Sequence, residues 1–217
     1  IQKFIEFTHE RYFGALSAYF GSTIIGMFTD EPNIMGRGGI KNLIPWTPGF
    51  LEWYLDHGND IRDLLALWLD VGSETAIKRK QYRKAVHQRL EMAYYQPISH
   101  WCEQHGIALT GHPEASDDIG VLRYFHIPGQ DIVWRWVAPE DGKALNGVHS
   151  TQGKCSSDAA RHMEKRRNSN ECFGCCGPDG IQWAFSMDDM KWYMDWLFVR
   201  GVNLLYPHAF FYSIREK

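Results

Sequence analysis

Two glutamates, Glu31 and Glu171, each lie at or next to the end of a short predicted strand and could act together as a pair of carboxylates. Cleavage of a glycosidic bond needs one carboxylic acid to protonate the leaving oxygen and one carboxylate to attack the anomeric carbon or activate water. A single glutamate at the end of a strand is more often a solvated loop residue or an ion-pair partner. Because two such residues occur, we predict that Glu31 and Glu171 are catalytic.

Other polar and aromatic side chains also follow apolar stretches and could hold a sugar. Asp30 and Asn170 precede the two glutamates, so each could bind a hydroxyl or tune the pKa of its neighbour. A neutral imidazole can donate to a hydroxyl or to a carboxylate, although a lone histidine is more often structural. The predicted substrate-binding residues are Asp30, His112, Glu114, Trp134, Asn170 and His208.

Aromatic residues make up 14% of the chain and include nine tryptophans, which suits a protein that offers flat apolar faces to sugar rings. Trp46 and Trp183 are further candidates for such stacking. For any one tryptophan, packing in the core or under a loop is the commoner role.

The cysteines offer a second kind of chemistry. Cys172, Cys175 and Cys176 form a C-x-x-C-C sequence, which can be half of a zinc site or a redox pair. A structural zinc site needs a second pair of ligands, and neither Cys155 nor His162 has the usual spacing. Asp30, Glu31 and His112 could in principle bind a divalent cation, but nothing in their spacing requires one. We predict no metal and no cofactor.

Five short stretches are predicted as the strands that place these residues. They are residues 24–28, which we expect to be buried on both faces, and residues 107–111, 131–136, 168–172 and 202–206. Helices are predicted over residues 2–20, 73–106 with a kink at Pro97, 118–124, 156–166 and 186–200, with shorter helical pieces over 51–70 and a long loop over 33–50.

Strands that alternate with helices predict a parallel sheet with right-handed crossovers, either doubly wound or closed into a (β/α) barrel. Each predicted strand ends in polar residues, and in a barrel all such ends meet at one mouth. The sequence contains no G-x-G-x-x-G fingerprint of a nucleotide-binding fold. We therefore predict an α/β protein in which residues 1–217 form a single, partial TIM-type barrel domain.

Charge and hydropathy exclude some partners. The net charge is −3 and no basic stripe is evident, so nucleic acid is not expected. No run of 18 apolar residues occurs, so no membrane helix is expected. The chain starts at Ile1 inside a predicted helix, which suggests part of a longer protein with further domains. The first residues do not resemble a secretory leader, so location stays open, secreted or periplasmic if the parent chain has a signal peptide.

Six segments carry a resemblance to a known family. In chain order they are HERYFGALSAYFGSTIIGMFTDEPNI, PWTPGFLEWY, GIALTGHPEA, IPGQDIVWR, NECFG and GVNLLYPHAFFYS. Together they resemble the catalytic barrel of large bacterial and plant-type glycoside hydrolases similar to family 106 α-L-rhamnosidases. The resemblance covers nearly the whole chain.

The resemblance implies a (β/α)8 barrel of which this chain supplies about strands four to eight. It implies that Glu31 and Glu171 are the two catalytic carboxylates, with acid and base unassigned, and that the reaction inverts the anomeric centre. The segment NSNECFGCCGP departs from the family, which tends to have a plainer glycine and aromatic turn there.

The sequence therefore predicts a glycosidase that acts on a carbohydrate and takes part in polysaccharide degradation, and the resemblance implies an α-L-rhamnoside as the substrate. Two alternatives stay open. One is a carbohydrate-binding barrel without catalysis. The other is a metal-dependent hydrolase that uses Asp30, His112, Glu114 and His208.

Overall fold

The computed structural model describes residues 1–35, 43–139, 142–174 and 185–208. The chain divides into two compact units, which are described separately below. The helical unit comprises Asn33–Pro97 with Ile1, and the sheet unit comprises Gln2–Pro32 with Ile98–Lys217. No helix among the described residues is long and apolar enough to cross a membrane. That residues 1–217 form a single barrel domain stays a prediction.

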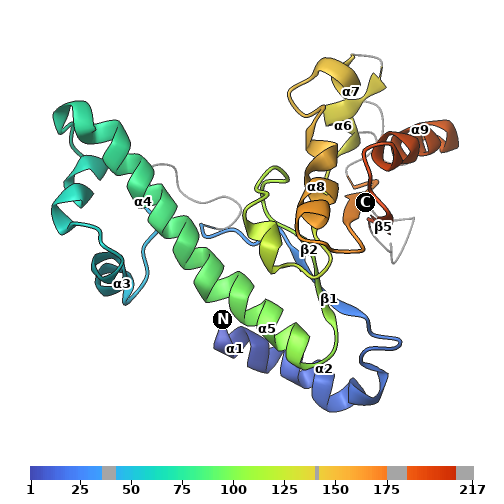
Figure 1. Cartoon of the computed structure of the whole chain (residues 1–217), viewed down its shortest axis with the longest axis horizontal. Helices are drawn as coiled ribbons and strands as arrows, with labels where there is room; N and C mark the ends of the chain where they lie inside the picture. The colour runs from blue at the N-terminus through green and yellow to red at the C-terminus, as the bar shows by residue number, and fades with distance from the viewer. Residues whose placement is uncertain (36–42, 140–141, 175–184, 209–217) are drawn as a thin grey trace, which may run out of the picture. The chain divides into compact units, whose positions relative to one another are not determined.

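The strands of the sheet unit all pair in parallel, as predicted (Figure 1). β1 (Gly26–Asp30) pairs with β2 (Ala108–His112), and β3 (Gly129–Asp131), β4 (Ser169–Cys172) and β5 (Leu204–Pro207) form a second sheet in that order. Parallel pairing brings the carboxyl ends of neighbouring strands to the same edge. The fold is thus a mixed α/β arrangement with two small parallel sheets.

Two glycines allow the neighbouring strands of the sheet unit to approach closely. At Gly111 in β2 the backbone φ is +102°, and a Cβ atom there would lie 2.0 Å from the carbonyl oxygen of Thr29 in β1. A Cβ atom at Gly129 in β3 would lie 2.1 Å from the carbonyl oxygen of Gly111. No side chain fits at either position, so glycine is required where β2 passes between β1 and β3.

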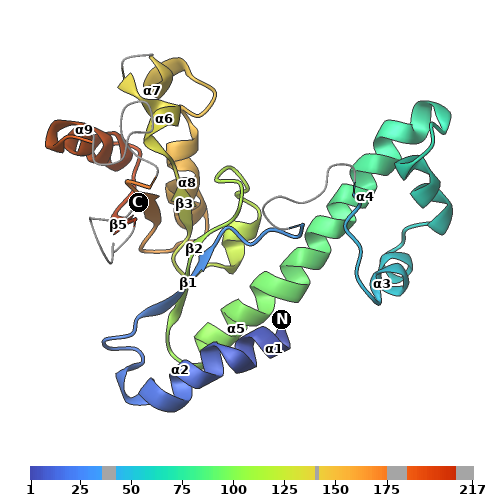
Figure 2. The same ribbon diagram turned by 180° about the vertical axis from the view of Figure 1, so that it is seen from behind.

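Helices surround these strands. In chain order they are α1 (Gln2–Phe7), α2 (His9–Leu16), the 3-10 turn η1 (Ser17–Tyr19), α5 (Gln96–Gln104), η5 (Val121–Tyr124), α6 (Trp134–Val137), α7 (Lys143–Asn146), η7 (Gln152–Lys154), α8 (Cys155–His162) and α9 (Met187–Phe198). The helices α1 and α2 lie alongside α5 in Figure 1 and in the reverse view of Figure 2. The indole Nε1 of Trp101 in α5 donates to Oε1 of Glu10 in α2 at 2.6 Å.

The predicted capping box opens α9. The Ser186 side chain accepts from the backbone N–H of Asp189, and the Asp189 carboxylate accepts from the backbone N–H of Ser186. The buried side of α9 then packs against the end of the second sheet and against α6. This core includes Ile132, Trp134, Cys172, Tyr193, Trp196 and Leu197.

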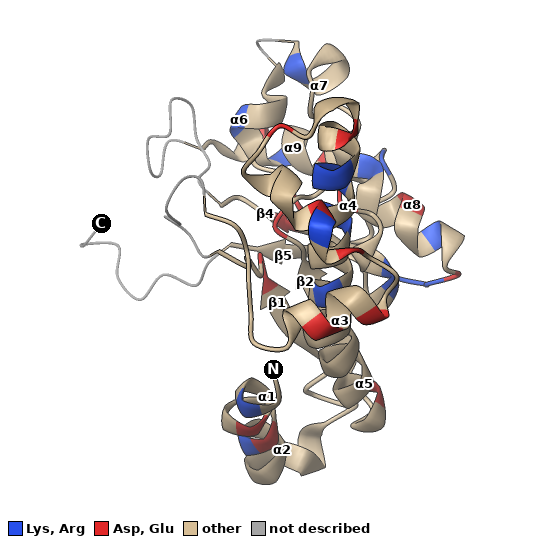
Figure 3. Cartoon of the chain, turned by 90° about the vertical axis from the view of Figure 1, so that its left-hand side faces the viewer, with Lys and Arg blue, Asp and Glu red and all other residues tan. Residues whose placement is uncertain are grey.

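The helical unit consists of α3 (Phe50–Asp56), η2 (Ile61–Leu67), η3 (Gly72–Glu74), α4 (Thr75–Leu90) and a π-helical turn over Glu91–Tyr95. Its buried core contains Phe50, Tyr54, Tyr82 and Ala85. α4 contains six lysine or arginine residues and no aspartate or glutamate (Figure 3).

The long helix predicted over residues 73–106 is confirmed, because helical residues run without a break from Thr75 to Gln104. The predicted irregularity near Pro97 takes the form of the π-helical turn that ends at Tyr95, two residues before the proline. Since proline has no N–H to donate into the helix, a wider turn next to it relieves the local backbone.

Two details of the predicted strands are wrong. The first strand is not buried on both faces, because Phe28 is 44% exposed and Ile25 is 59% exposed. The third strand was expected to begin at Asp131, but β3 ends at Asp131 and Trp134–Val137 form the short helix α6. A short apolar run such as IVWRWV does not distinguish a strand from a buried helical turn by its periodicity.

Candidate active site

The polar residues at the strand ends of the sheet unit meet at one edge. In the strand register Asp30 lies opposite His112, and Glu171 lies opposite both Asp131 and Tyr206. Because every pairing is parallel, these residues lie at the same level along their strands. The expectation that strand ends from distant parts of the sequence come together is met for Asp30, His112 and Glu171.

His112 lies at the centre of this group. Its Nε2 atom is 2.9 Å from Oε2 of Glu171 and 3.5 Å from Oδ1 of Asp30. The imidazole is buried, whereas the Asp30 carboxylate is largely exposed. The ring of Phe28 packs edge-on against the imidazole, with 5.7 Å between the ring centroids. A buried imidazole thus lies between the exposed carboxylate of Asp30 and the partly buried carboxylate of Glu171.

Both ring nitrogens of His112 face acceptors. Nε2 faces Glu171, and Nδ1 lies 3.3 Å from the carbonyl oxygen of Pro113. Only the protonated ring can donate from both nitrogens at once. Burial lowers the pKa of His112, but the hydrogen bond to Glu171 and the charge of Asp131 outweigh it, so the pKa is raised above its ordinary value. The geometry therefore favours a charged imidazolium.

Glu171 is held as a carboxylate. The hydrogen bond from His112 lowers its pKa below the ordinary value, burial acts in the opposite direction, and the charges of His112 and His208 add to the lowering. His208 follows β5, and its Nε2 atom is 4.0 Å from Oε1 of Glu171. Its backbone N–H donates to the carbonyl oxygen of Cys172 at 2.7 Å. His208 therefore lies beside Glu171, as the sequence suggested.

Asp131 is a carboxylate that sequence reasoning missed. Burial raises the pKa of Asp131 to about 6; the charge of His112 opposes this rise, and those of Glu171, Glu31 and Asp30 add to it. Its backbone carbonyl accepts from the hydroxyl of Ser116 at 2.6 Å. The signal was present in the sequence, because Pro128 and Gly129 precede a polar strand end there. It was overlooked because the apolar run after Asp131 resembled the strand itself.

Glu31 lies directly beyond the end of β1. Its backbone N–H donates to the carbonyl oxygen of His112 at 3.3 Å, so the β1–β2 pairing extends to this residue. The backbone φ of Glu31 is +41°, an uncommon value for a residue with a side chain. Such strain is maintained where the surrounding structure demands a particular side-chain direction. Glu31 is half-buried, and its charge contributes to the raised pKa of Asp131.

Three of the predicted substrate-binding residues do not join this group. Trp134 is 2% exposed and packs in the core against Phe185, Trp192 and Tyr193, so its ring has no face for a sugar. Asn170 is fully buried, and its side chain donates to the carbonyl oxygen of Glu171 rather than reaching the surface. Glu114 is exposed two residues beyond the end of β2.

The group could also be considered as a metal site. Carboxylate oxygens of Asp30 and Glu171 and a ring nitrogen of His112 all lie within 4.8 Å of one another. A metal bound there would take the lone pair of that nitrogen and displace the proton that otherwise occupies it. Cys172 is buried, and Cys175, Cys176 and Trp183 lie outside the described residues. The absence of a metal and a cofactor stays a prediction.

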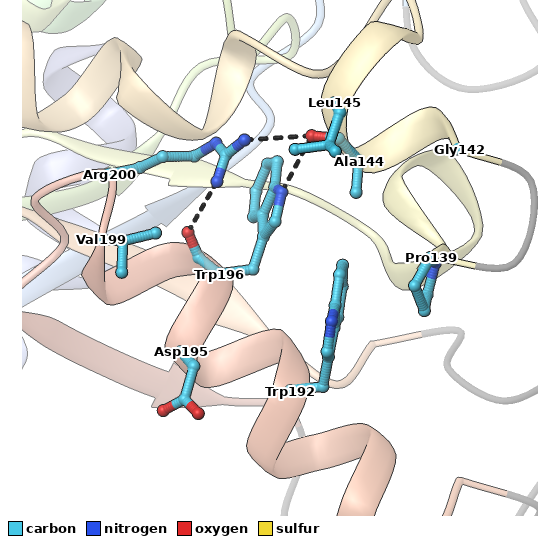
Figure 4. Close-up of a pocket in the computed structure, with 9 residues that line it drawn as sticks. All are labelled: Pro139, Gly142, Ala144, Leu145, Trp192, Asp195, Trp196, Val199 and Arg200. Atoms are coloured by element: carbon cyan, nitrogen blue, oxygen red, sulfur yellow. Dashed lines mark hydrogen bonds between the residues drawn. The ribbon is translucent and has the colours of Figure 1, made fainter.

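A cavity of about 430 Å³ lies apart from the strand ends, between α9 and the segment that contains α7 (Figure 4). Trp192 and Trp196 contribute to its lining. The indole N–H of Trp196 and the guanidinium of Arg200 both donate to the carbonyl oxygen of Ala144. The indole N–H of Trp196 and the guanidinium of Arg200 are therefore committed within the protein. None of the predicted site residues lines it, and we do not assign it to the active site.

The chain was compared with family models, curated proteins and solved structures. No family model matches the chain, and the search of curated proteins found no match. Among solved structures, the chain is similar to a rhamnosidase from Novosphingobium sp. PP1Y, with a TM-score of 0.59 and 21% sequence identity over 76% of this chain. The match covers 16% of that chain, so this chain spans a small part of the larger protein. At this identity the similarity shows a related fold.

Proposed function

We propose that this chain forms part of the catalytic barrel of a glycoside hydrolase in which Glu31 and Glu171 cleave a glycosidic bond. The observation that carries the proposal is the hydrogen bond between His112 and Glu171 at the shared edge of the strands. It provides a partly buried, ionised carboxylate next to further acidic groups. The related fold of a rhamnosidase supports the same class of reaction.

Glu171 is suited to act as the general base. A carboxylate whose pKa is lowered stays ionised at neutral pH, so it can accept a proton from water but is a poor proton donor. The charged ring of His112 would hold the carboxylate in place. Glu31, from the neighbouring sheet, would then serve as the acid that protonates the leaving oxygen. This division of roles suits an inverting reaction, in which water attacks from the face opposite the leaving group.

The proposed substrate is a carbohydrate, with an α-L-rhamnoside as the first choice because of the sequence resemblance and the related fold. The five described strands are parallel and follow chain order within each sheet, as in a section of a (β/α)8 barrel. Strands and accessory domains from the rest of a longer protein would complete the barrel and its substrate cleft.

Hydrolysis of aryl glycosides tests the proposal directly. We expect the protein to release nitrophenol from 4-nitrophenyl α-L-rhamnoside, or from another glycoside in a panel. Glu31→Gln and Glu171→Gln should each reduce kcat by about a thousandfold or more, because each removes an acid–base group and its charge. Proton NMR of the sugar first released gives the stereochemical outcome, and inversion is expected.

The matched control is Glu103→Gln, which removes the same charge from the exposed surface of α5 in the same unit. It should leave kcat unchanged. Circular dichroism of all three variants checks that each is folded. Full activity of either catalytic variant would exclude the two-glutamate mechanism, and glycan binding without hydrolysis would favour a carbohydrate-binding protein.

A second candidate function is a metal-dependent hydrolase, which the close approach of Asp30, His112 and Glu171 favours. Complete loss of activity on treatment with a chelator, and its recovery with one divalent cation, would support this function. Full activity in the chelator would support the reaction that uses carboxylates alone.

A further inference from the structure

The helical unit contains a cavity of about 310 Å³ that is separate from the strand ends. One wall is formed by Trp46, Thr47 and Phe50, and the other by Val86, Arg89 and Leu90 of α4. Two contacts fix the position of the segment that forms the first wall. The hydroxyl of Tyr82 in α4 donates to the carbonyl oxygen of Pro45, and the ring of Phe50 packs edge-on against Trp46, with 5.1 Å between the ring centroids.

Arg89 is an unusual residue in this lining because its guanidinium has no hydrogen-bond acceptor and no carboxylate partner among the residues that the structure describes. Its Nε atom is buried and makes no hydrogen bond, and no ion pair to Arg89 exists among the described residues. The guanidinium carbon lies 5.8 Å from the ring centroid of Trp53, which supports the charge through a cation–π contact. A buried hydrogen-bond donor without an acceptor costs free energy. A ligand that supplies an acceptor removes this cost and therefore binds more tightly.

The positive charge of α4 also attracts an anion. Of its basic side chains, Lys78 contacts Asp63 at 2.6 Å and Arg79 donates to the carbonyl oxygen of Ala66 at 2.7 Å. Lys80, Arg83 and Lys84 join Arg89 in having no carboxylate partner in the part of the chain that the structure describes. The unpaired cations of α4 together raise the local concentration of anions, although each exposed one contributes little by itself.

We propose that this cavity binds a sugar that carries a carboxylate, such as a hexuronic acid. The carboxylate would accept two parallel hydrogen bonds from Arg89, the geometry that a guanidinium fits best. The apolar face of the sugar ring would pack on Trp46, whose side chain is 52% exposed. A volume near 300 Å³ is at the lower end for ligand pockets, which suits a single ring.

Arg89 by itself indicates that the ligand carries a carboxylate, whereas the choice of a sugar rests on the proposed function. Cations beside an aromatic ring also occur where proteins bind single-stranded nucleic acid, but those surfaces present several rings on which successive bases stack. Here Trp46 is the one exposed indole in the wall. The cavity therefore favours a single acidic ring over a polynucleotide.

Titration calorimetry with galacturonate and with galactose, on the full chain, tests the proposal. The two sugars differ in the acid group, so galacturonate should bind and galactose should bind at least about tenfold more weakly. Arg89→Met should weaken galacturonate binding by about tenfold or more. Trp46→Ala, at an exposed position, should weaken it as well. Arg83→Met is the matched control, because it removes the same charge from an exposed position on the same helix, and it should change binding by less than about twofold.

Equal binding of galactose and galacturonate, or an equal loss in Arg83→Met and Arg89→Met, would overturn the proposal. So would failure to bind galacturonate while a single-stranded oligonucleotide binds. Circular dichroism of the variants confirms that they are folded. Because the readout is binding, its failure leaves the hydrolysis of a neutral aryl rhamnoside untouched, and the two proposals can fail separately.

Discussion

The Nε2 atom of His112 lies 2.9 Å from Oε2 of Glu171, while Nδ1 of the same ring lies 3.3 Å from the carbonyl oxygen of Pro113. The ring is therefore clamped between a carboxylate and a backbone acceptor, and it is buried. Removal of this imidazole should affect the ionisation of Glu171 more than it affects the shape of the site. That expectation separates a positioning role for His112 from a purely structural one.

We expect His112→Phe to reduce kcat/KM by at least about tenfold, since general acid–base catalysis contributes about 10²–10⁴-fold. The hydrogen bond from His112 is the largest cause of the lowered pKa of Glu171, so its loss raises that pKa. A base that must be ionised then becomes active only at higher pH. The acidic limb of the pH profile of kcat/KM should move to higher pH.

Two further variants check this interpretation. His112→Gln retains an N–H donor and should recover part of the activity and of the pH profile. His208→Phe should have a smaller effect, because Nε2 of His208 is 4.0 Å from Glu171, beyond hydrogen-bond distance, and its side chain is partly exposed. If His112→Phe loses activity with an unchanged pH profile, His112 does not tune Glu171.

Asp131→Asn should make the protein more stable and less active. The pKa of Asp131 is raised to about 6 from an ordinary value of 3.8, so its charge destabilises the folded state as pH rises through this range. At pH 7.5 the variant should gain up to about 3 kcal/mol in free energy of unfolding, and the gain should vanish below about pH 4. Urea denaturation at both pH values measures this. If the variant and the parent protein differ by the same free energy of unfolding at both pH values, the charge of Asp131 does not destabilise the folded state.

The edge at which the site forms could be predicted from the sequence. Residues 26–30, 108–112, 169–172 and 204–207 lie within one or two residues of predicted strands. For the strands at 26–30, 108–112 and 204–207 the reason is physical: short apolar runs that end in polar residues are typical of parallel strands with exposed carboxyl ends, whereas the segment around Glu171 is polar and is placed by its position between two helical patterns. That Asp30, His112 and Glu171 meet follows from this pattern.

The partners within the site could not be predicted in the same way. Asp131 was missed because β3 has only three residues and a longer apolar run follows it. Its position before Glu171 predicts Asn170 as a sugar ligand, but neighbouring residues of a strand point to opposite faces, and Asn170 points into the core. Trp134 lies in a helix whose burial depends on α9, far along the chain. Such contacts are set by tertiary packing.

Gly111→Ala should strongly destabilise the sheet unit. A Cβ atom at this position would lie 2.0 Å from the carbonyl oxygen of Thr29, and the φ of +102° is unfavourable for alanine. We expect a loss of about 3 kcal/mol or more in the free energy of unfolding. Gly14→Ala is the matched control: a Cβ atom there meets no atom within 4 Å, and α2 should gain up to about 1 kcal/mol. A loss of less than 1 kcal/mol in Gly111→Ala, by urea denaturation, would contradict the close approach of β1 and β2.

His126 should make the sheet unit sensitive to acid. Its Nδ1 atom accepts a hydrogen bond from the backbone N–H of Leu109 in β2 at 2.9 Å, which a protonated Nδ1 cannot do. Burial lowers the pKa of His126, repulsion from Lys165 adds to the lowering, and Glu103 opposes it. A histidine with a lowered folded-state pKa leaves stability intact above the unfolded value of 6.5, and stability is lost as pH falls below it.

In His126→Asn the side-chain oxygen can still accept from Leu109 but does not titrate in this range. The variant should therefore lose less free energy of unfolding than the parent protein between pH 7.5 and pH 5, as measured by urea denaturation. His9, whose pKa is also lowered by burial with Glu10 opposing, is present in both proteins, so the difference between them isolates His126. Parallel losses in the two proteins would show that His126 does not couple the β2 backbone to pH.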